Sequence, residues 1–272
     1  MLKWIGNKQR FSEEIAASFP SHFGTYFEPF LGSGAVLAAL SPAKALASDS
    51  FGPLIEIWSA LKNNPKLLVA WYEERYALTQ EIGKELAYAR IRESYNARAN
   101  GADLLFLSRA CYGGVVRFRK RDGFMSTPCG VHSPISPAAF ESRVTEWRKR
   151  VSGTEFVNCD YRESMARATA GDLVYCDPPY VDSQTIIYGA QSFRIEELWA
   201  EIEKCKARGV YVALSIDGSK GSGKRKIEIS PPSGLIESEF EVSCGRSMLK
   251  RFQMDGRTLE GEKVSDRLLL TF

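Results

Sequence analysis

The segment from residue 25 to residue 49 constrains the fold most, because it has the order strand, glycine-rich loop, helix, strand. "TYFEPF" (25–30) is predicted to be a short strand, and "LGSG" leads into "AVLAALS", which is apolar and rich in good helix formers. Pro42 marks the end of this helix, and "KALASD" (44–49) is a second strand that ends in an acid. This order is typical of the start of a doubly wound α/β sheet.

A long helical segment interrupts this α/β pattern. Three stretches at 54–64, 65–99 and 103–114 are predicted helices, and residues 137–151 form a fourth. The alternation of strands and helices returns at residue 155 and continues to the C-terminal "RLLLTF". We therefore expect an α/β domain formed by residues 1–55 and 152–272 around a mostly helical insertion, residues 56–151.

The insertion also carries a predicted β-hairpin and a basic stretch. "GGVVRFRKRDGFMSTPCG" (113–130) has two extended runs around Asp122-Gly123, which is a strong hairpin turn signal. Between Arg90 and Arg121 there are eight Lys or Arg residues and two Asp or Glu residues, although the net charge of the chain is only +3. Such a block is most often a solvated face, but it also suits a polyanion such as nucleic acid.

The composition of the chain argues against several other classes of protein. The 272 residues are 44% hydrophobic and 25% charged, as in an ordinary globular protein. The six cysteines form no CxxC pair and there are only two histidines, so we expect neither a zinc site nor a disulfide framework. No apolar run approaches the roughly 20 residues that span a bilayer, and "MLKWIGNKQRF" contains no signal-peptide core. We expect a reduced, intracellular protein.

The loop "FEPFLGSG" (27–34) is the first candidate binding site. Gly32 and Gly34 allow the backbone to approach a ligand, and the helix that follows offers free N–H groups. A plain tight turn is the alternative interpretation. Asp49, at the end of the next strand, strengthens the binding interpretation because an acid at this place accepts hydrogen bonds from ribose hydroxyls. Asp49 is alternatively a helix N-cap, and the two roles are compatible.

A second loop, "GSKGSGK" (218–224), matches most of a phosphate-binding P-loop. The magnesium-binding Ser or Thr is replaced by Arg225, and the following "KIEIS" is strand-like rather than helical. Without a helix the loop lacks the N–H groups and the dipole that hold a phosphate. We favour a flexible basic loop, with the backbone of a nucleic acid as one contact.

The third candidate site is "GDLVYCDPPY" (171–180), a strand that runs into an acid, two prolines and a tyrosine. Ligands bind at the carboxyl ends of strands in open α/β sheets. Prolines have no N–H, so the Asp177 carboxylate and the Pro178 carbonyl form a rigid pair of acceptors beside the ring of Tyr180. This arrangement suits a planar group with an exocyclic amine, although a structural turn is the alternative for an isolated DPP triplet.

These motifs, in this order, resemble those of the Dam-type (alpha-class, D12) site-specific DNA adenine-N6 methyltransferases. The resemblance covers nearly the whole chain and rests on "LKWIGNK", "FEPFLGSG", "ASD" (47–49), "SRACYGGVVRFRKRDGFMSTPCG", "GDLVYCDPPY" and "GRSMLKRF". It implies a Rossmann-like, S-adenosylmethionine-dependent methyltransferase sheet. It also implies that the insertion at 56–151 is a target-recognition domain that binds double-stranded DNA.

The resemblance further implies the residues of the active site. S-adenosyl-L-methionine would be the methyl donor, with Asp49 on its ribose, Asp160 facing its adenine and Asp177 between the donor and the target amine. Asp177 would accept and orient the amine without acting as a nucleophile, and no metal is required. The donor-binding positions are Trp4, Lys8, Phe30, Gly32, Gly34, Asp49, Asp160 and Asp177, and the catalytic ones are Asp177, Pro178 and Tyr180.

A duplex hides the N6 amine of adenine, so the base must flip out and stack on Tyr180. Tyr112 is either a wedge that supports the disrupted stack or a core aromatic. The sequence departs from the family at Gly113-Gly114, at Arg119 and in "FMSTP", so the recognition sequence is left open, as is a partner restriction endonuclease. The expected DNA contacts are Arg109, Tyr112, Arg117, Arg119, Lys120 and Arg121.

Other activities fit less well. DPPY rather than NPPY or SPPY disfavours methylation of glutamine or of cytosine N4, and Cys129 lies in the hairpin rather than beside the donor loop, as a cytosine-C5 enzyme would need. An RNA adenine-N6 methyltransferase and a non-catalytic DNA-binding protein with the same fold stay as alternatives. A methyltransferase of this kind is expected in the cytoplasm of a bacterium or archaeon, or encoded by a phage.

Overall fold

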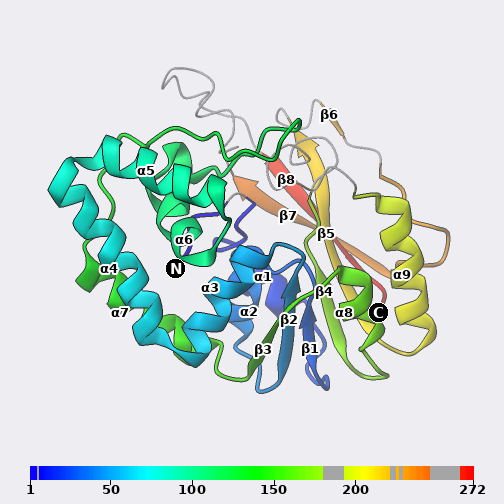
Figure 1. Cartoon of the computed structure of the whole chain (residues 1–272). Helices are drawn as coiled ribbons and strands as arrows, with labels where there is room; N and C mark the ends of the chain where they lie inside the picture. Colours follow the sequence, from blue (N-terminus) through cyan, green and yellow to red (C-terminus); the bar gives the residue numbers. More distant parts are fainter. Residues whose placement is uncertain (5, 180–192, 221–224, 227–228, 246–263) are drawn as a thin grey trace.

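The computed structural model shows a twisted sheet covered by helices, with a helical lobe on one side (Figure 1). It describes residues 1–4, 6–179, 193–220, 225–226, 229–245 and 264–272. Tyr180 and most of the "GRSMLKRF" motif lie outside these residues. In the part of the chain that is described, no helix is long and apolar enough to cross a membrane. The same residues contain no group of three or more His, Cys, Asp or Glu side chains that could hold a metal ion.

Within the described residues, eight strands form one sheet with the order β3-β2-β1-β4-β5-β8-β7, and β6 pairs with β5. The first five strands in this order, β3, β2, β1, β4 and β5, are parallel to one another. The strand β8 runs antiparallel to both of its neighbours, β5 and β7. The strand order therefore reverses between β1 and β4, which confirms the predicted doubly wound sheet. The strands are β1 (Tyr26–Glu28), β2 (Ala45–Asp49), β3 (Thr154–Asn158), β4 (Leu173–Cys176), β5 (Tyr211–Lys220), β6 (Arg225–Lys226), β7 (Ser238–Gly245) and β8 (Val264–Leu270).

Side-chain alternation along the strands divides the interior into two cores. Tyr26 and Tyr175 point to one face of the sheet, and the neighbouring Phe27 and Val174 point to the other. Because both faces are covered, the central strands are mostly apolar, as is usual for parallel sheets, and their polar residues come at the strand ends. The first face is covered by α1 (Ser12–Ala17), α2 (Ala35–Leu40) and α3 (Gly52–Asn63), and the second by α8 (Tyr161–Ala166) and α9 (Ile195–Ala207) (Figure 1).

The helical lobe contains one more break than the sequence predicted. The expected helix at 65–99 is divided at Gly83, whose φ of +85° lies in the left-handed region that favours glycine. The predicted domain boundary between residues 55 and 56 falls inside α3, which packs against β2 and β3 as well as against the lobe. The lobe consists of α4 (Pro65–Ile82), α5 (Lys84–Ala97), α6 (Gly101–Ala110), the short 3₁₀ helix η1 (Tyr112–Gly114) and α7 (Pro137–Arg150).

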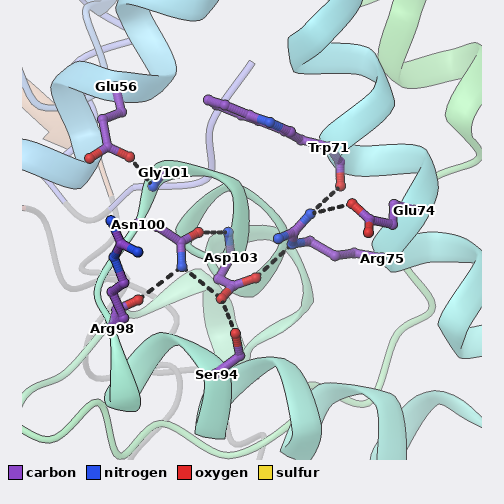
Figure 2. Close-up of polar contacts among 9 residues, drawn as sticks. All are labelled: Glu56, Trp71, Glu74, Arg75, Ser94, Arg98, Asn100, Gly101 and Asp103. Carbon is purple, nitrogen blue, oxygen red and sulfur yellow. Dashed lines mark hydrogen bonds and ion pairs between the residues drawn. The ribbon is translucent and has the colours of Figure 1, made fainter.

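All residues of α6 are buried, and a carboxylate in its first turn joins it to two neighbouring helices. Asp103 accepts hydrogen bonds from Arg75 Nε at 2.7 Å, Ser94 Oγ at 2.7 Å and Asn100 Nδ2 at 2.8 Å (Figure 2). Asn100 in turn caps the helix, because its Oδ1 accepts from the backbone N–H of Asp103 at 2.8 Å. Three side chains therefore satisfy one buried carboxylate.

A second polar contact fastens the start of α6 to α3. Glu56 Oε2 accepts from the backbone N–H of Gly101 at 2.6 Å (Figure 2). A Cβ at Gly101 would lie 2.8 Å from Glu56 Cβ and 3.0 Å from the carbonyl oxygen of Pro53, so only glycine permits this approach. Since α3 also packs on the sheet, α6 links the lobe to the α/β domain.

The predicted hairpin at 113–130 is less regular than expected. Its two arms form isolated bridges, Phe118 with Met125 and Cys111 with Cys129, rather than a continuous ladder. The turn is where the sequence placed it, with Gly123 at a φ of +65°. The loop expected from residue 218 also begins later, because β5 continues to Lys220. Residues 221–224 lie outside the described part of the chain.

Candidate active site

A cavity of about 230 Å³ opens at the reversal point of the sheet, beyond the carboxyl ends of β1 and β4. This is the place at which doubly wound sheets bind their ligands. Its wall combines the glycine-rich loop, the ends of β2 and β4, the start of α8 and the N-terminal segment. Of the predicted donor-binding positions, Trp4, Lys8, Phe30, Gly32, Asp49, Asp160 and Asp177 all line it.

The glycine loop has a conformation that larger residues rarely adopt. Gly32 and Gly34 have φ angles of +47° and +59°, and Gly34 is the residue that precedes α2. A Cβ on Gly34 would lie 3.0 Å from the ring of Trp58, and one on Gly32 would lie 3.4 Å from Trp4. The Trp58 indole N–H also donates to the Gly32 carbonyl at 3.2 Å. Two tryptophans therefore hold the loop against the cavity.

Asp49 connects this loop to the loop that follows β2. Its carboxylate accepts from the backbone N–H of Gly32 at 3.2 Å and from that of Phe51 at 3.0 Å. Phe51, rather than Asp49, occupies the N-cap position of α3. Burial raises the pKa of Asp49 to about 6, although the backbone hydrogen bonds oppose this shift. Asp49 is half-buried and lines the cavity, so a ligand there could donate further hydrogen bonds to its carboxylate.

Aromatic side chains form one end of the cavity. Phe30 stacks on Tyr161 with ring centroids 5.1 Å apart, and Phe193 meets Phe30 edge-on at 5.9 Å. Asp160 caps α8 by accepting from the backbone N–H of Arg162 at 2.9 Å. All five residues line the cavity. An aromatic wall beside a carboxylate suits a planar heterocycle that carries an amine.

Asp177 and Lys8 form the polar end of the cavity. Lys8 Nζ donates to both carboxylate oxygens of Asp177, at 2.7 and 2.9 Å, although the two residues are 169 positions apart. Asp177 directly follows β4, and the next residue, Pro178, is buried. The sequence motif therefore places an acid at the cavity edge, as expected. The predicted role of Tyr180 falls outside the described residues.

Glu28 is a site residue that the sequence analysis missed. It is the last residue of β1 and lines the cavity, but it is buried, and burial raises its pKa to about 8. The Tyr26 hydroxyl donates to Glu28 Oε2 at 2.7 Å. An acid inside the apolar stretch "TYFEPF" was the available signal, because charged residues are rarely buried without a reason. Tyr161 and Phe193 were also missed, and no motif indicated them.

The hairpin presents most of the expected DNA contacts on the surface. Arg117, Lys120 and Arg121 are exposed, and Arg119 is partly buried. Asp122 in the turn pairs with Arg119 at 3.1 Å and with Arg121 at 3.2 Å. These exposed ion pairs are weak, so both arginines are able to exchange Asp122 for a phosphate.

Arg109 does not lie on this surface, contrary to the expectation from sequence. It is only 5% exposed, donates to the Met1 carbonyl and lies over the ring of Phe140 at 5.8 Å. The reason is its position in the last turn of α6, a helix that is buried on all sides. Tyr112, three residues further on, is 41% exposed and so is not a core aromatic.

The sheet order and the site together define a class of protein. A glycine loop after β1 and an acid after β2, at the reversal point of the sheet, form a nucleotide-type binding site. Asp177 and Pro179, which follow β4, lie on the wall of the same cavity. This combination defines the chain as a Rossmann-like methyltransferase.

Comparison with known proteins narrows the class to one family. A profile of the D12 class N6 adenine-specific DNA methyltransferases matches residues 4–222, and the chain belongs to this family. It is therefore a site-specific N6-adenine DNA methyltransferase, as the motif order predicted. This result favours DNA over the RNA alternative and an enzyme over a non-catalytic binding protein.

Several curated relatives match much of the chain. A DNA adenine methylase of Vibrio cholerae serotype O1 is 27% identical over 227 residues, which are 79% of each chain. The type II methyltransferase M1.LlaDCHI of Lactococcus lactis subsp. cremoris is 26% identical over 261 residues, covering 87% of this chain and 89% of that one. The Retron Ec67 DNA adenine methylase of Escherichia coli is 29% identical over 187 residues, covering 66% and 63%.

Proposed function

We propose that the enzyme binds S-adenosyl-L-methionine in the 230 Å³ cavity and methylates N6 of an adenine that has flipped out of duplex DNA. The observation that carries this proposal is the position of Asp177. Its carboxylate lies at the edge of β4, on the wall of the cavity that also contains the Gly32 loop and Asp49. A donor in the cavity and an amine at its mouth would both meet Asp177.

The residues of the cavity fit such a donor. Gly32 lines the cavity and has no side chain, so its backbone can approach the ligand closely, whereas Gly34 lies behind it against Trp58. Asp49 would accept from ribose hydroxyls, and Phe30 and Tyr161 would flank the adenine, with Asp160 near its amine. When bound, S-adenosyl-L-methionine supplies a methyl group on a sulfonium, which is already a good leaving group.

Asp177 and the following proline would activate the target amine. The lone pair of adenine N6 is delocalised into the ring, so the amine is a poor nucleophile. Hydrogen bonds from its two N–H groups to the Asp177 carboxylate and the Pro178 carbonyl return electron density to nitrogen and orient the lone pair toward the cavity. Tyr180 would stack on the flipped base.

The helical lobe and the hairpin would bind the DNA, so we propose residues 56–151 as the target-recognition part. Four of the eight basic residues between Arg90 and Arg121 lie in the hairpin, and three of these four are exposed. Arg117 would reach a base edge, and Arg119, Lys120 and Arg121 would hold phosphates. Tyr112, exposed beside the hairpin, would act as the wedge. A DNA substrate also supports the expected cytoplasmic location.

The decisive experiment incubates the purified enzyme with the donor and random-sequence duplexes and maps N6-methyladenine. Methylation at one short site is expected, and Asp177→Ala should lower the rate at least about 100-fold while DNA binding stays near the wild-type value. Glu203→Ala, at an exposed position of α9 that does not line the cavity, serves as the control and should keep its rate. Full activity of Asp177→Ala, or methylation of RNA rather than DNA, would overturn the proposal.

A further inference from the structure

Lys8 lies between two carboxylates that are far from it in the sequence, Asp177 and Asp266. Its ammonium is 2.7 Å from Asp177 Oδ1 and 3.5 Å from Asp266 Oδ2. It also contacts the Gly6 carbonyl at 3.4 Å. Lys8 and Asp266 are both buried, so this ion pair is only weakly screened by water.

This arrangement competes with the role proposed for Asp177. Both oxygens of Asp177 already accept hydrogen bonds from Lys8, at 2.7 and 2.9 Å. In the proposed function the same carboxylate must also accept an N–H of the adenine amine. Each oxygen has a second lone pair for that purpose, but Lys8 and the amine compete for the same carboxylate. A buried ammonium that is displaced from one carboxylate without a second one nearby costs several kcal/mol.

The fold places Asp266 where it offers that other partner. Asp266 lies on β8, with Asp217 of β5 and Val242 of β7 as its neighbours across the sheet. The register shifts next to it on both sides, between Asp217 and Ser219 and between Ser243 and Gly245. Such bulges are frequent beside active sites, where they redirect a side chain. Here they lie where the Asp266 side chain reaches Lys8.

We propose that Asp266 is a positioning residue that receives the Lys8 ammonium when Asp177 accepts the adenine amine. This inference rests on the proposed function of Asp177. Lys8 would move from a two-oxygen contact with Asp177 toward Asp266 and stay paired throughout. The freed oxygen of Asp177 then accepts the amine. Glu28 would not compete for Lys8, because burial raises the pKa of Glu28 to about 8 and its carboxyl is mostly neutral at pH 7.

The test is Asp266→Asn, which keeps the shape of the side chain and removes its charge. We expect kcat to fall about 10- to 100-fold, the effect of one hydrogen bond to a charged group. The KM for DNA and the Kd for S-adenosyl-L-methionine, the latter measured by calorimetry, should stay within about twofold, because Asp266 itself does not line the donor cavity. Asp266→Glu should restore part of kcat.

Asp172 provides a matched control. It is 7% exposed, as Asp266 is, but it precedes β4 and accepts from the Thr25 and Thr169 backbone N–H groups at 2.7 and 2.8 Å. Asp172→Asn should lower the melting temperature and leave kcat of the folded enzyme unchanged. An equal loss of kcat in both variants would mean general destabilisation and would refute the positioning role.

A double-mutant cycle separates this inference from the proposed function. If Asp266 acts through Lys8, adding Asp266→Asn to a Lys8→Met enzyme should change kcat by less than about twofold. The role of Asp266 would be overturned if the losses of kcat from Lys8→Met and Asp266→Asn multiplied in the double variant. An unchanged kcat in Asp266→Asn, or a weaker affinity of that variant for the donor, would also overturn it. Failure of the proposed function looks different, because the wild-type enzyme itself would then leave DNA adenine unmethylated.

Discussion

Two carboxylates in different regions of the molecule have opposite surroundings. Asp103 in the helical lobe is 2% exposed and accepts from the side chains of Arg75, Ser94 and Asn100 (Figure 2). Asp49 in the α/β domain accepts from two backbone N–H groups and faces a cavity. The first carboxylate is saturated by its own protein, and the second retains acceptor capacity for a ligand.

The helical lobe and the surroundings of the cavity differ in how far their polar groups are satisfied, as these two carboxylates do. In the lobe, polar side chains satisfy one another and fix how α6 sits against α3, α4 and α5. Around the cavity, carboxylates come from the ends of separate strands and meet at the edge of the sheet. A mutually satisfied network rigidifies a structure, whereas an incompletely satisfied group with a raised pKa is a sign of a functional site.

The largest expected effect is the loss of stability on removal of the Asp103 carboxylate. Asp103→Ala should lower the free energy of unfolding by about 3–5 kcal/mol, because it leaves the Arg75 guanidinium uncompensated and Ser94 and Asn100 without their acceptor. Chemical denaturation measures this change. The donor affinity of the folded fraction should remain near that of the wild type.

Glu74→Ala is the matched control, since Glu74 is the exposed partner of the same arginine, at 3.2 Å. It should change the free energy of unfolding by less than about 1 kcal/mol. If Asp103→Ala were equally mild, the contrast between the two regions would fail.

The next effect concerns Asp49 and should appear in donor binding. Asp49→Asn should weaken the affinity for S-adenosyl-L-methionine about 10- to 100-fold through loss of a charged hydrogen bond. With its pKa raised to about 6, Asp49 of the wild type is mostly protonated at pH 5, so the affinity should fall as the pH drops from 7 to 5. Calorimetric titration across this range is the measurement, and the variant should lose this pH dependence.

The stability of the donor-free enzyme should change with pH in the direction opposite to the donor affinity. A carboxyl whose pKa is raised in the folded state stabilises the fold below its unfolded pKa, and this contribution is lost as the pH rises through about 6. Asp49→Asn should therefore not lower the melting temperature at pH 7. A clear loss of stability there would make Asp49 a structural group like Asp103.

The smallest effect is expected at the hairpin. Arg117→Ala should relax the choice of methylation site by about 1–3 kcal/mol of discrimination, because an arginine that reads a base edge contributes this much. Mapping N6-methyladenine in random duplexes measures it. Arg148→Ala, an exposed arginine near the end of α7, is the control and should leave the site unchanged. Unchanged specificity of Arg117→Ala would remove Arg117 from base recognition.

The sequence predicted the parts of the site that depend on local chemistry. Gly32 and Gly34 indicated a left-handed loop, and an acid that ends a strand indicated the sheet edge, as Asp49 and Asp177 show. The prediction that Arg109 lies on the DNA-binding surface was wrong, because its burial depends on packing between α6 and α7 that no local pattern reveals. The break at Gly83 was missed because the apolar pattern continues on both sides of it.

The sequence by itself therefore determined the alternation of strands and helices, the glycine loop, and the family to which the chain belongs. Only the tertiary structure decided which distant residues share the site. Lys8, Asp177 and Asp266 meet because the order of strands places β8 beside β5 and the N-terminal segment over the sheet edge. A local pattern carries the conformation of a segment, whereas contacts between segments arise from the packing of the whole sheet.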